Sequence, residues 1–148
     1  MFPPYNYTSL RKLNKIIPIA GGENIFTPFE FEYCVENEVF SYFQPDVSKI
    51  GGITVGLKFL EIAKRSNVPI YFHNRPNNGW IQILASAHLA SVYSGHCLIE
   101  TPHGTVPTDY YYNHNEVNNE YVSLRGKGLG IALKENLPPK RKQKILLP

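Results

Sequence analysis

Four short apolar runs recur through the first hundred residues and are separated by longer segments of mixed polarity. The runs are Ile16–Ala20, Val39–Phe43, Val68–Phe72 and His96–Ile99. Their length and their content of Val, Ile, Tyr and Phe are typical of β-strands. The segments between them are long enough to hold a helix, so the pattern predicts strands that alternate with helices.

The first two helices are predicted from polar residues at their starts. Asn6 can cap a short helix that carries Leu10 and Leu13 on its inner side. The sequence Thr27-Pro28-Phe29-Glu30 has the form of a capping box with proline at the first helical position. It predicts a helix that runs to about Glu36.

Two longer helices are predicted from apolar residues at helical spacing. One begins at Gly52 and ends near Ser66, and the other follows the polar loop 74–79. Leu57, Leu60 and Ala63 are expected to form the inner stripe of the first, and the second carries Ile81, Leu84, Ala85, His88, Leu89 and Val92. Together the elements predict an α/β fold with about four parallel strands and helices on one face.

An ionisable residue follows each of the four predicted strands. These residues are Glu23, Asp46, His73 and Glu100, and successive ones lie 23, 27 and 27 residues apart, the length of one strand-helix unit. In a βα barrel the catalytic residues come from the carboxyl ends of several strands. The sequence therefore predicts that these four residues converge in one active site.

The residue types indicate which chemistry each position can perform. A carboxylate such as Asp46 beside His73 fixes the tautomer of the imidazole and raises its basicity, which suits a general acid or base. Glu23 is a candidate Mg²⁺ ligand, although one carboxylate cannot hold the ion without further ligands. Glu100 could hydrogen-bond a substrate carboxylate, with a structural cap as the alternative. Arg75 and Trp80 follow His73 in the sequence and are candidates to line a substrate pocket, with packing at the surface as the alternative.

Composition limits the partners and the location. Of the net charge of +3, the basic stretch Lys140-Arg141-Lys142-Gln143-Lys144 supplies more than the whole, so the rest of the chain is near neutral and favours neither nucleic acid nor a membrane surface. Residues 138–148 are expected to form a disordered, basic tail. Cys34 and Cys97 fit no metal or redox spacing and are expected to be buried, reduced thiols. No apolar segment has membrane-spanning length. We expect a cytoplasmic protein without a signal peptide.

The segment after Glu100 lacks a clear period. Residues 101–119 are rich in Tyr, Asn, His and Pro, and we expect an irregular closing segment there. A strand is possible at Glu120–Leu124. The glycines of Gly126–Gly130 neither follow a core strand nor open a helix, so a phosphate-binding loop is rejected.

In order and spacing these stretches resemble the mandelate racemase and muconate lactonizing enzyme branch of the enolase superfamily, in its C-terminal barrel domain. The resemblance extends over nearly the whole chain. The stretches that carry it are Pro18–Glu23, Gln44–Thr54, Val68–Asn74, Leu98–Glu100 and Gly126–Ala132.

The resemblance implies a fold and a set of roles. Residues 1–137 would form the C-terminal half of an enolase-type (β/α)7β barrel with an irregular closing segment. Glu23 would be the third Mg²⁺ ligand, Asp46 and His73 the dyad of racemase-like enzymes and acid-sugar dehydratases, and Glu100 the acid that faces the substrate. The muconate-type subgroup places a lysine where this chain has Asp46, so that subgroup is set aside.

Two departures from the family pattern change what is expected of this chain. Lys127 stands where the family usually has proline, which is a minor change. More importantly, Met1 corresponds to a position after the strands that carry the first two metal ligands and a second base. The 148-residue chain alone is therefore expected to be inactive.

By the resemblance, the complete enzyme removes the proton α to a carboxylate with the help of Mg²⁺. The first expectation is an acid-sugar dehydratase in which His73 protonates the departing hydroxyl. The alternatives are a racemase or epimerase, with His73 as one of two opposed bases, and a catalytically inactive fragment. The expected partner is a small-molecule carboxylate, a sugar acid or 2-hydroxy acid, and the full-length enzyme is expected to be a homo-oligomer.

Overall fold

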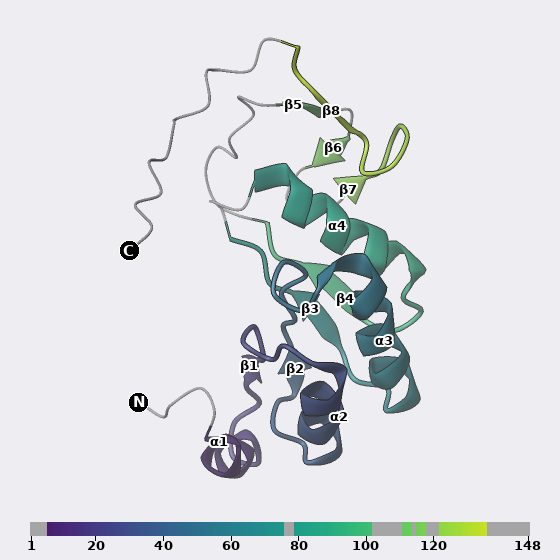
Figure 1. Ribbon diagram of the computed structural model, residues 1–148. Coiled ribbons are helices and arrows are strands. Elements are labelled where there is room, and N and C mark those ends of the chain that lie inside the picture. The colour runs from purple at the N-terminus through teal and green to yellow at the C-terminus, as the bar shows by residue number, and fades with distance from the viewer. Residues whose placement is uncertain (1–5, 76–78, 102–110, 114, 118–121, 136–148) are drawn as a thin grey trace, which may run out of the picture.

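Four parallel strands form the sheet around which the protein is built. The computed structural model describes residues 6–75, 79–101, 111–113, 115–117 and 122–135. In this part of the chain the strands lie in the order β1-β2-β3-β4, with bounds Ala20–Gly21, Tyr42–Phe43, Ile70–Phe72 and Cys97–Ile99 (Figure 1). Each strand pairs in parallel with the next one along the chain. This confirms the predicted α/β fold, with the topology of four consecutive units from the C-terminal half of a barrel.

The helices begin where the sequence predicts. α1 spans Tyr7–Asn14 and α2 spans Pro28–Glu36. The side chain of Asn6 accepts a hydrogen bond from Ser9 N at 3.1 Å, and Thr27 Oγ1 accepts one from Glu30 N at 3.1 Å. Each bond satisfies an amide of the first helical turn that has no partner within the helix. α3 spans Gly52–Arg65 and α4 spans Gly79–Val92.

The core lies between the sheet and helices α2, α3 and α4 (Figure 1). Phe31 on α2 joins the two layers, because its ring centroid lies 5.0 Å from that of Phe43 on β2 and 4.5 Å from that of Phe59 on α3. Ile70 and Phe72, which project from β3 on the same face, are fully buried. Burying such side chains stabilises the fold by about 1.5–3 kcal/mol each relative to leaving them exposed.

The first two strands begin later than predicted. Ile16 and Ile17 are 77% and 58% exposed, and their amides donate to the carbonyl of Leu13 at the end of α1. Those amides are therefore not available to a sheet, and Pro18 has none to offer. Val39 likewise donates its amide to a carbonyl of α2. The apolar runs at Ile16–Ala20 and Val39–Phe43 are strands only over their last residues.

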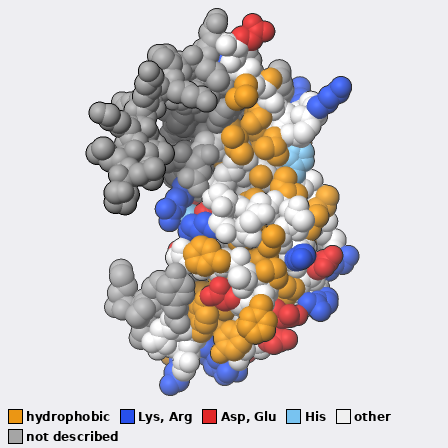
Figure 2. Space-filling view, viewed as in Figure 1, with side chains coloured by type: hydrophobic (Ala, Val, Ile, Leu, Met, Phe, Trp, Pro, Cys, Tyr) orange, Lys and Arg blue, Asp and Glu red, His pale blue; other side chains and the backbone are white. Residues whose placement is uncertain are grey.

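Leu57, which was predicted to face the core, lies at the surface instead, and so do Ile81 and Val92 on α4. Leu57, Ile81 and Val92 are 44%, 53% and 65% exposed. Figure 2 shows apolar side chains gathered over the α3 and α4 side of the molecule. A groove of about 480 Å³ lies there, and its lining includes Leu57, His88, Val92 and Leu129. The helices are apolar on more than one side, so spacing alone could not select the side that packs on the sheet.

The segment after Glu100 holds more regular structure than predicted. Where it is described, β5 (Tyr111–Asn113) pairs with β8 (Ile131–Leu133), and β6 (Glu116–Val117) pairs with β7 (Val122–Ser123), both antiparallel. The predicted tail 138–148 lies outside the described residues. No helix in the described part has the length and apolar character that crossing a bilayer requires.

Candidate functional site

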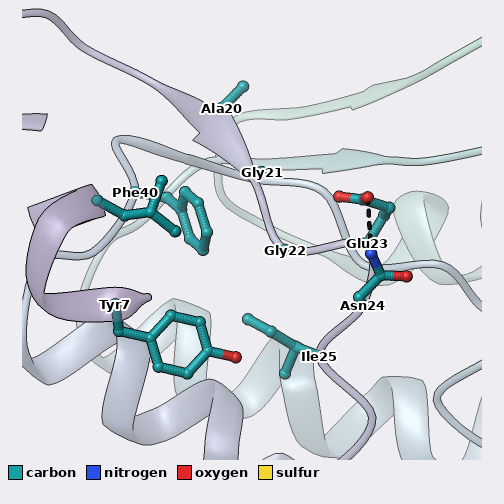
Figure 3. A pocket seen from close by; sticks show the side chains of 9 residues that line it. Tyr7, Ala20, Gly21, Gly22, Glu23, Asn24, Ile25 and Phe40 are labelled. Atoms are coloured by element: carbon teal, nitrogen blue, oxygen red, sulfur yellow. Dashed lines mark hydrogen bonds between the residues drawn. The ribbon is translucent and has the colours of Figure 1, made fainter. Parts of the chain in front are cut away.

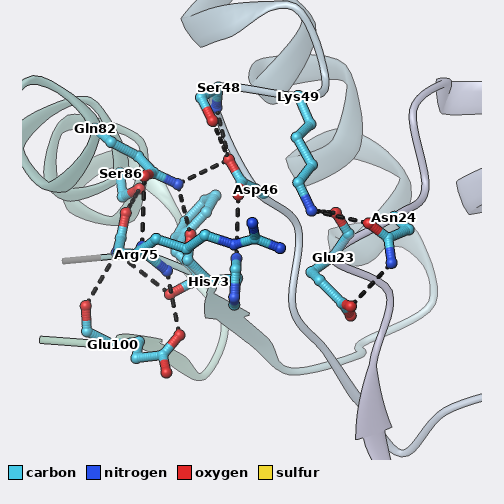
Figure 4. Close-up of polar contacts among 12 residues, drawn as sticks. Glu23, Asn24, Asp46, Ser48, Lys49, His73, Arg75, Gln82, Ser86 and Glu100 are labelled. Carbon is cyan, nitrogen blue, oxygen red and sulfur yellow. Dashed lines mark hydrogen bonds and ion pairs between the residues drawn. The ribbon is translucent and has the colours of Figure 1, made fainter. Parts of the chain in front are cut away.

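The parallel ladder brings the ends of successive strands to the same level. Beyond the strands themselves, Gln44 N donates to Gly21 O at 2.8 Å, His73 N to Pro45 O at 3.1 Å and Glu100 N to Phe72 O at 3.0 Å. The residues that follow each strand therefore leave the sheet at the same end, the carboxyl end of the strands. Figure 4 shows Glu23, Asp46, His73 and Glu100 in one region.

Asp46 and His73 are in direct contact. His73 Nδ1 lies 3.1 Å from Asp46 Oδ2, and the two side chains come from the ends of the adjacent strands β2 and β3. The imidazole is 20% exposed whereas the carboxylate is fully buried. Because Nδ1 faces the carboxylate, Nε2 is the nitrogen that can exchange a proton with a substrate.

Hydrogen bonds keep the buried carboxylate of Asp46 charged. Burial by itself would raise the pKa of Asp46, but hydrogen bonds from Ser48 and His73 outweigh it and hold the pKa below its usual value. Ser48 donates twice to Oδ1, from its backbone N at 2.9 Å and from its hydroxyl at 2.5 Å. A carboxylate held in this way can orient His73 and stabilise its protonated form.

Helix α4 contributes two polar side chains that the sequence analysis missed. Gln82 Nε2 donates to Asp46 Oδ1 at 2.7 Å and to the carbonyl of His73 at 3.0 Å. Ser86 Oγ donates to Asn74 Oδ1 at 2.9 Å. Gln82 and Ser86 are polar, four residues apart and therefore on one face of a mostly apolar helix, and that pattern was the signal that could have revealed them.

Glu100 is held by the residue that follows His73. Its carboxylate accepts a hydrogen bond from Asn74 N at 3.2 Å, and its carbonyl accepts one from Asn74 Nδ2 at 3.1 Å. Asn74 is 2% exposed. Glu100 is therefore anchored beside the dyad, at the end of β4.

Glu23 is anchored to different partners. Its Oε1 accepts a hydrogen bond from Asn24 Nδ2 at 3.0 Å, and its carbonyl accepts one from Lys49 Nζ at 3.0 Å. Gly22, with φ of 105°, provides the turn that leads from β1 to Glu23. Glu23 and Asn24 also help to line a pocket of about 160 Å³ between β1 and α1 (Figure 3).

The described residues do not make a complete metal site. Nowhere among them do three or more His, Cys, Asp or Glu side chains lie close enough together to hold an ion. Mg²⁺ takes six oxygen ligands, and it needs carboxylates to compete with its hydration water. Glu23 alone does not meet that requirement.

The two predicted pocket residues lie next to the network rather than within it. Arg75 is exposed, and its backbone N donates to Gln82 Oε1 at 3.5 Å. Trp80 is half-buried in the first turn of α4. Their role in substrate binding stays a prediction.

Comparison with known proteins gives consistent matches. The profile of the family described as enolase C-terminal domain-like matches residues 1–137. The D-galactonate dehydratase of Pectobacterium atrosepticum is 28% identical over 130 residues, which are 82% of this chain and 34% of that protein. The D-galactonate dehydratase of Klebsiella pneumoniae is 30% identical over 129 residues, or 81% of this chain and 33% of that protein.

The fold has similar solved structures as well. A mandelate racemase/muconate lactonizing enzyme-like protein from Rubrobacter xylanophilus superposes with a TM-score of 0.77 and 26% identity, covering 90% of this chain and 35% of that one. The chain therefore spans about a third of the length of the curated relatives it matches.

Proposed function

Because the chain belongs to the enolase C-terminal domain-like family, we propose that it supplies the Asp46–His73 dyad of an acid-sugar dehydratase. The dehydratase reaction is favoured over racemisation by the relatives, which are D-galactonate dehydratases. The substrate would be a sugar acid, a small carboxylate with a hydroxyl on the carbon next to the α-carbon.

The observation that carries the proposal is the hydrogen bond between His73 Nδ1 and Asp46 Oδ2. It joins an acid-base residue to a buried carboxylate at the ends of adjacent strands, where βα barrels place catalytic groups. Asp46 fixes the imidazole so that Nε2, on the opposite side of the ring, faces away from the carboxylate. A proton on Nε2 can then be donated to a leaving group.

The chemistry is the loss of water from two neighbouring carbons. A Lys or His base takes the α-proton, and the electron pair of the broken C–H bond forms the enediolate of the substrate carboxylate. The C–O bond on the next carbon then breaks as a double bond forms, and His73 donates its proton to the departing hydroxyl, which leaves as water. The enol product tautomerises to a 2-keto-3-deoxy acid.

The α-proton needs a base, and the enediolate needs positive charge. Sites of the enolase superfamily use a Lys or His base together with one or two Mg²⁺ ions. We propose Glu23 as one Mg²⁺ ligand, with the remaining ligands outside the described residues. Glu100, anchored by Asn74, is proposed as the acid that faces the substrate.

The test is turnover by a complemented protein. The chain is co-expressed with the N-terminal part of the Klebsiella pneumoniae relative and assayed with Mg²⁺ on a panel of sugar acids that includes D-galactonate. We expect 2-keto-3-deoxy acid to form, and we expect His73→Asn to lower kcat by at least about a hundredfold. Mg²⁺ affinity should stay unchanged in that variant, which separates a chemical defect from loss of the site.

Other outcomes would decide against the proposal. Near wild-type kcat in the His73→Asn protein would overturn the role of the dyad. Exchange of the α-proton with solvent deuterium, without loss of water, would instead identify a racemase or epimerase. Complemented protein that folds and binds Mg²⁺ but turns over no sugar acid would identify an inactive fragment.

A further inference from the structure

Helix α4 directs a buried amide toward the ends of β2 and β3. Gln82 is 4% exposed, although the residues around it in α4 are mostly apolar. Burying an amide costs free energy unless its hydrogen bonds are restored. Gln82 restores them entirely with groups of the candidate site, and the contacts join positions 36 and 9 residues away in sequence.

We propose that Gln82 is a positioning residue that holds the Asp46 carboxylate and the His73 backbone in a fixed position relative to each other. The inference rests on the proposed function, because it gives Gln82 the role of positioning that dyad. Gln82 is not expected to touch the substrate.

The orientation of the Gln82 amide follows from its partners. Asp46 Oδ1 and the carbonyl of His73 can only accept hydrogen bonds, so the NH₂ group must face both. Its two hydrogens match the two acceptors. The amide oxygen is left to face the backbone N of Arg75, at 3.5 Å. One side chain thus contacts the carboxylate of the dyad and the backbone on both sides of Asn74.

The two oxygens of the Asp46 carboxylate have different partners. Oδ1 accepts from Gln82 and from both donors of Ser48, whereas Oδ2 faces His73 (Figure 4). The donors on Oδ1 fix the plane of the carboxylate. Because Ser48 lies only two residues from Asp46, it fixes the carboxylate relative to its own loop. Gln82 is the donor that also holds the His73 backbone, so it sets the relation between the two residues.

Chemical reactivity of His73 tests the inference without turnover. Diethyl pyrocarbonate modifies neutral imidazole, and peptide mass spectrometry measures the rate at each histidine separately. At about pH 8 an ordinary imidazole is neutral. A carboxylate that accepts from Nδ1–H makes Nε2 more nucleophilic, so loss of the Asp46 contact slows the reaction at His73.

Two variants and two references complete the design. Gln82→Met removes the donor at similar length, and Gln82→Asn keeps an amide that is too short to reach both acceptors. Asp46→Asn gives the rate without the carboxylate. Ile83→Val removes a methylene from the neighbouring residue, which is buried (1% exposed) and whose side chain has no hydrogen-bonding group.

We expect both Gln82 variants to slow modification of His73 by about threefold or more, to near the rate of Asp46→Asn, while the other histidines keep their rates. Ile83→Val should leave the His73 rate unchanged. A faster rate at His73, or faster rates at all histidines, would mean that Gln82 only supports packing and would overturn the proposal. An unchanged His73 rate in a variant with native circular dichroism would overturn it too.

The proposed function and this inference can fail separately. Loss of His73 reactivity in the Gln82 variants would support the positioning role even if the complemented protein turns over no sugar acid. Turnover that depends on His73, together with unchanged His73 reactivity in the Gln82 variants, would leave the dyad in place and remove Gln82 from it.

Discussion

Hydrogen bonds stabilise the charged form of the buried Asp46 carboxylate. Its carboxylate is inaccessible to solvent, yet hydrogen bonds from Ser48 and His73 hold its pKa below the usual value despite the opposing effect of burial. A carboxylate whose pKa is lower in the folded chain stabilises that chain above the unfolded-state value, about 3.9. The stabilisation is lost as the pH falls through the folded-state pKa.

This sign predicts a pH-dependent effect of Asp46→Asn. We expect the substitution to lower the free energy of unfolding at pH 7 and to lower it less at about pH 3. That pH lies below the unfolded-state pKa of about 3.9, so the unfolded chain already binds the proton and part of the stabilisation is gone. Urea denaturation followed by circular dichroism at both pH values measures the difference. Glu32→Gln, which removes a solvent-exposed partner of Arg65, is the matched control. Equal losses at the two pH values for Asp46→Asn would contradict the prediction.

At the scale of the element, the start of α2 depends on one hydroxyl. Thr27 Oγ1 accepts from Glu30 N, and the Glu30 carboxylate in turn accepts from Phe26 N at 3.2 Å. We expect Thr27→Ala to destabilise the chain by about 1 kcal/mol, because the Glu30 amide then loses its partner. Thr27→Ser keeps the hydroxyl and should retain most of the stability. Urea denaturation compares the three proteins, and equal stability of the alanine and serine variants would refute the role of the cap.

At the scale of the whole molecule, the sheet has two outer edges. Within the described residues β1 pairs only with β2, and β4 pairs only with β3. The open edges present unpaired backbone groups, and Leu98 on β4 is 53% exposed. Such edges promote pairing with other chains.

We therefore expect the 148-residue chain, purified as a separate protein, to self-associate. Light scattering coupled to size-exclusion chromatography should give a mass above 16.8 kDa that rises with concentration. Adding the complementary N-terminal part of a relative should reduce this association by covering the edges. A monomeric mass at every concentration would show that the edges are already protected.

Local sequence determined the features that depend on nearby residues. The caps at Asn6 and Thr27 form because side chain and amide are three residues apart, so no distant contact is needed. The order of strands and helices also followed from the sequence, because parallel strands require a crossover between them. The regular spacing of Asp46, His73 and Glu100 placed them after successive strands for the same reason.

The tertiary structure decided where backbone amides and side chains find distant partners. β1 begins only at Ala20 because the amides of Ile16 and Ile17 are taken by α1, and Leu57 lies outside because the sheet selects another side of α3. Gln82 reaches Asp46 across 36 residues of sequence. Helical spacing specifies which residues share a face, but only packing specifies what that face meets, and the partners of a buried amide are fixed by that packing.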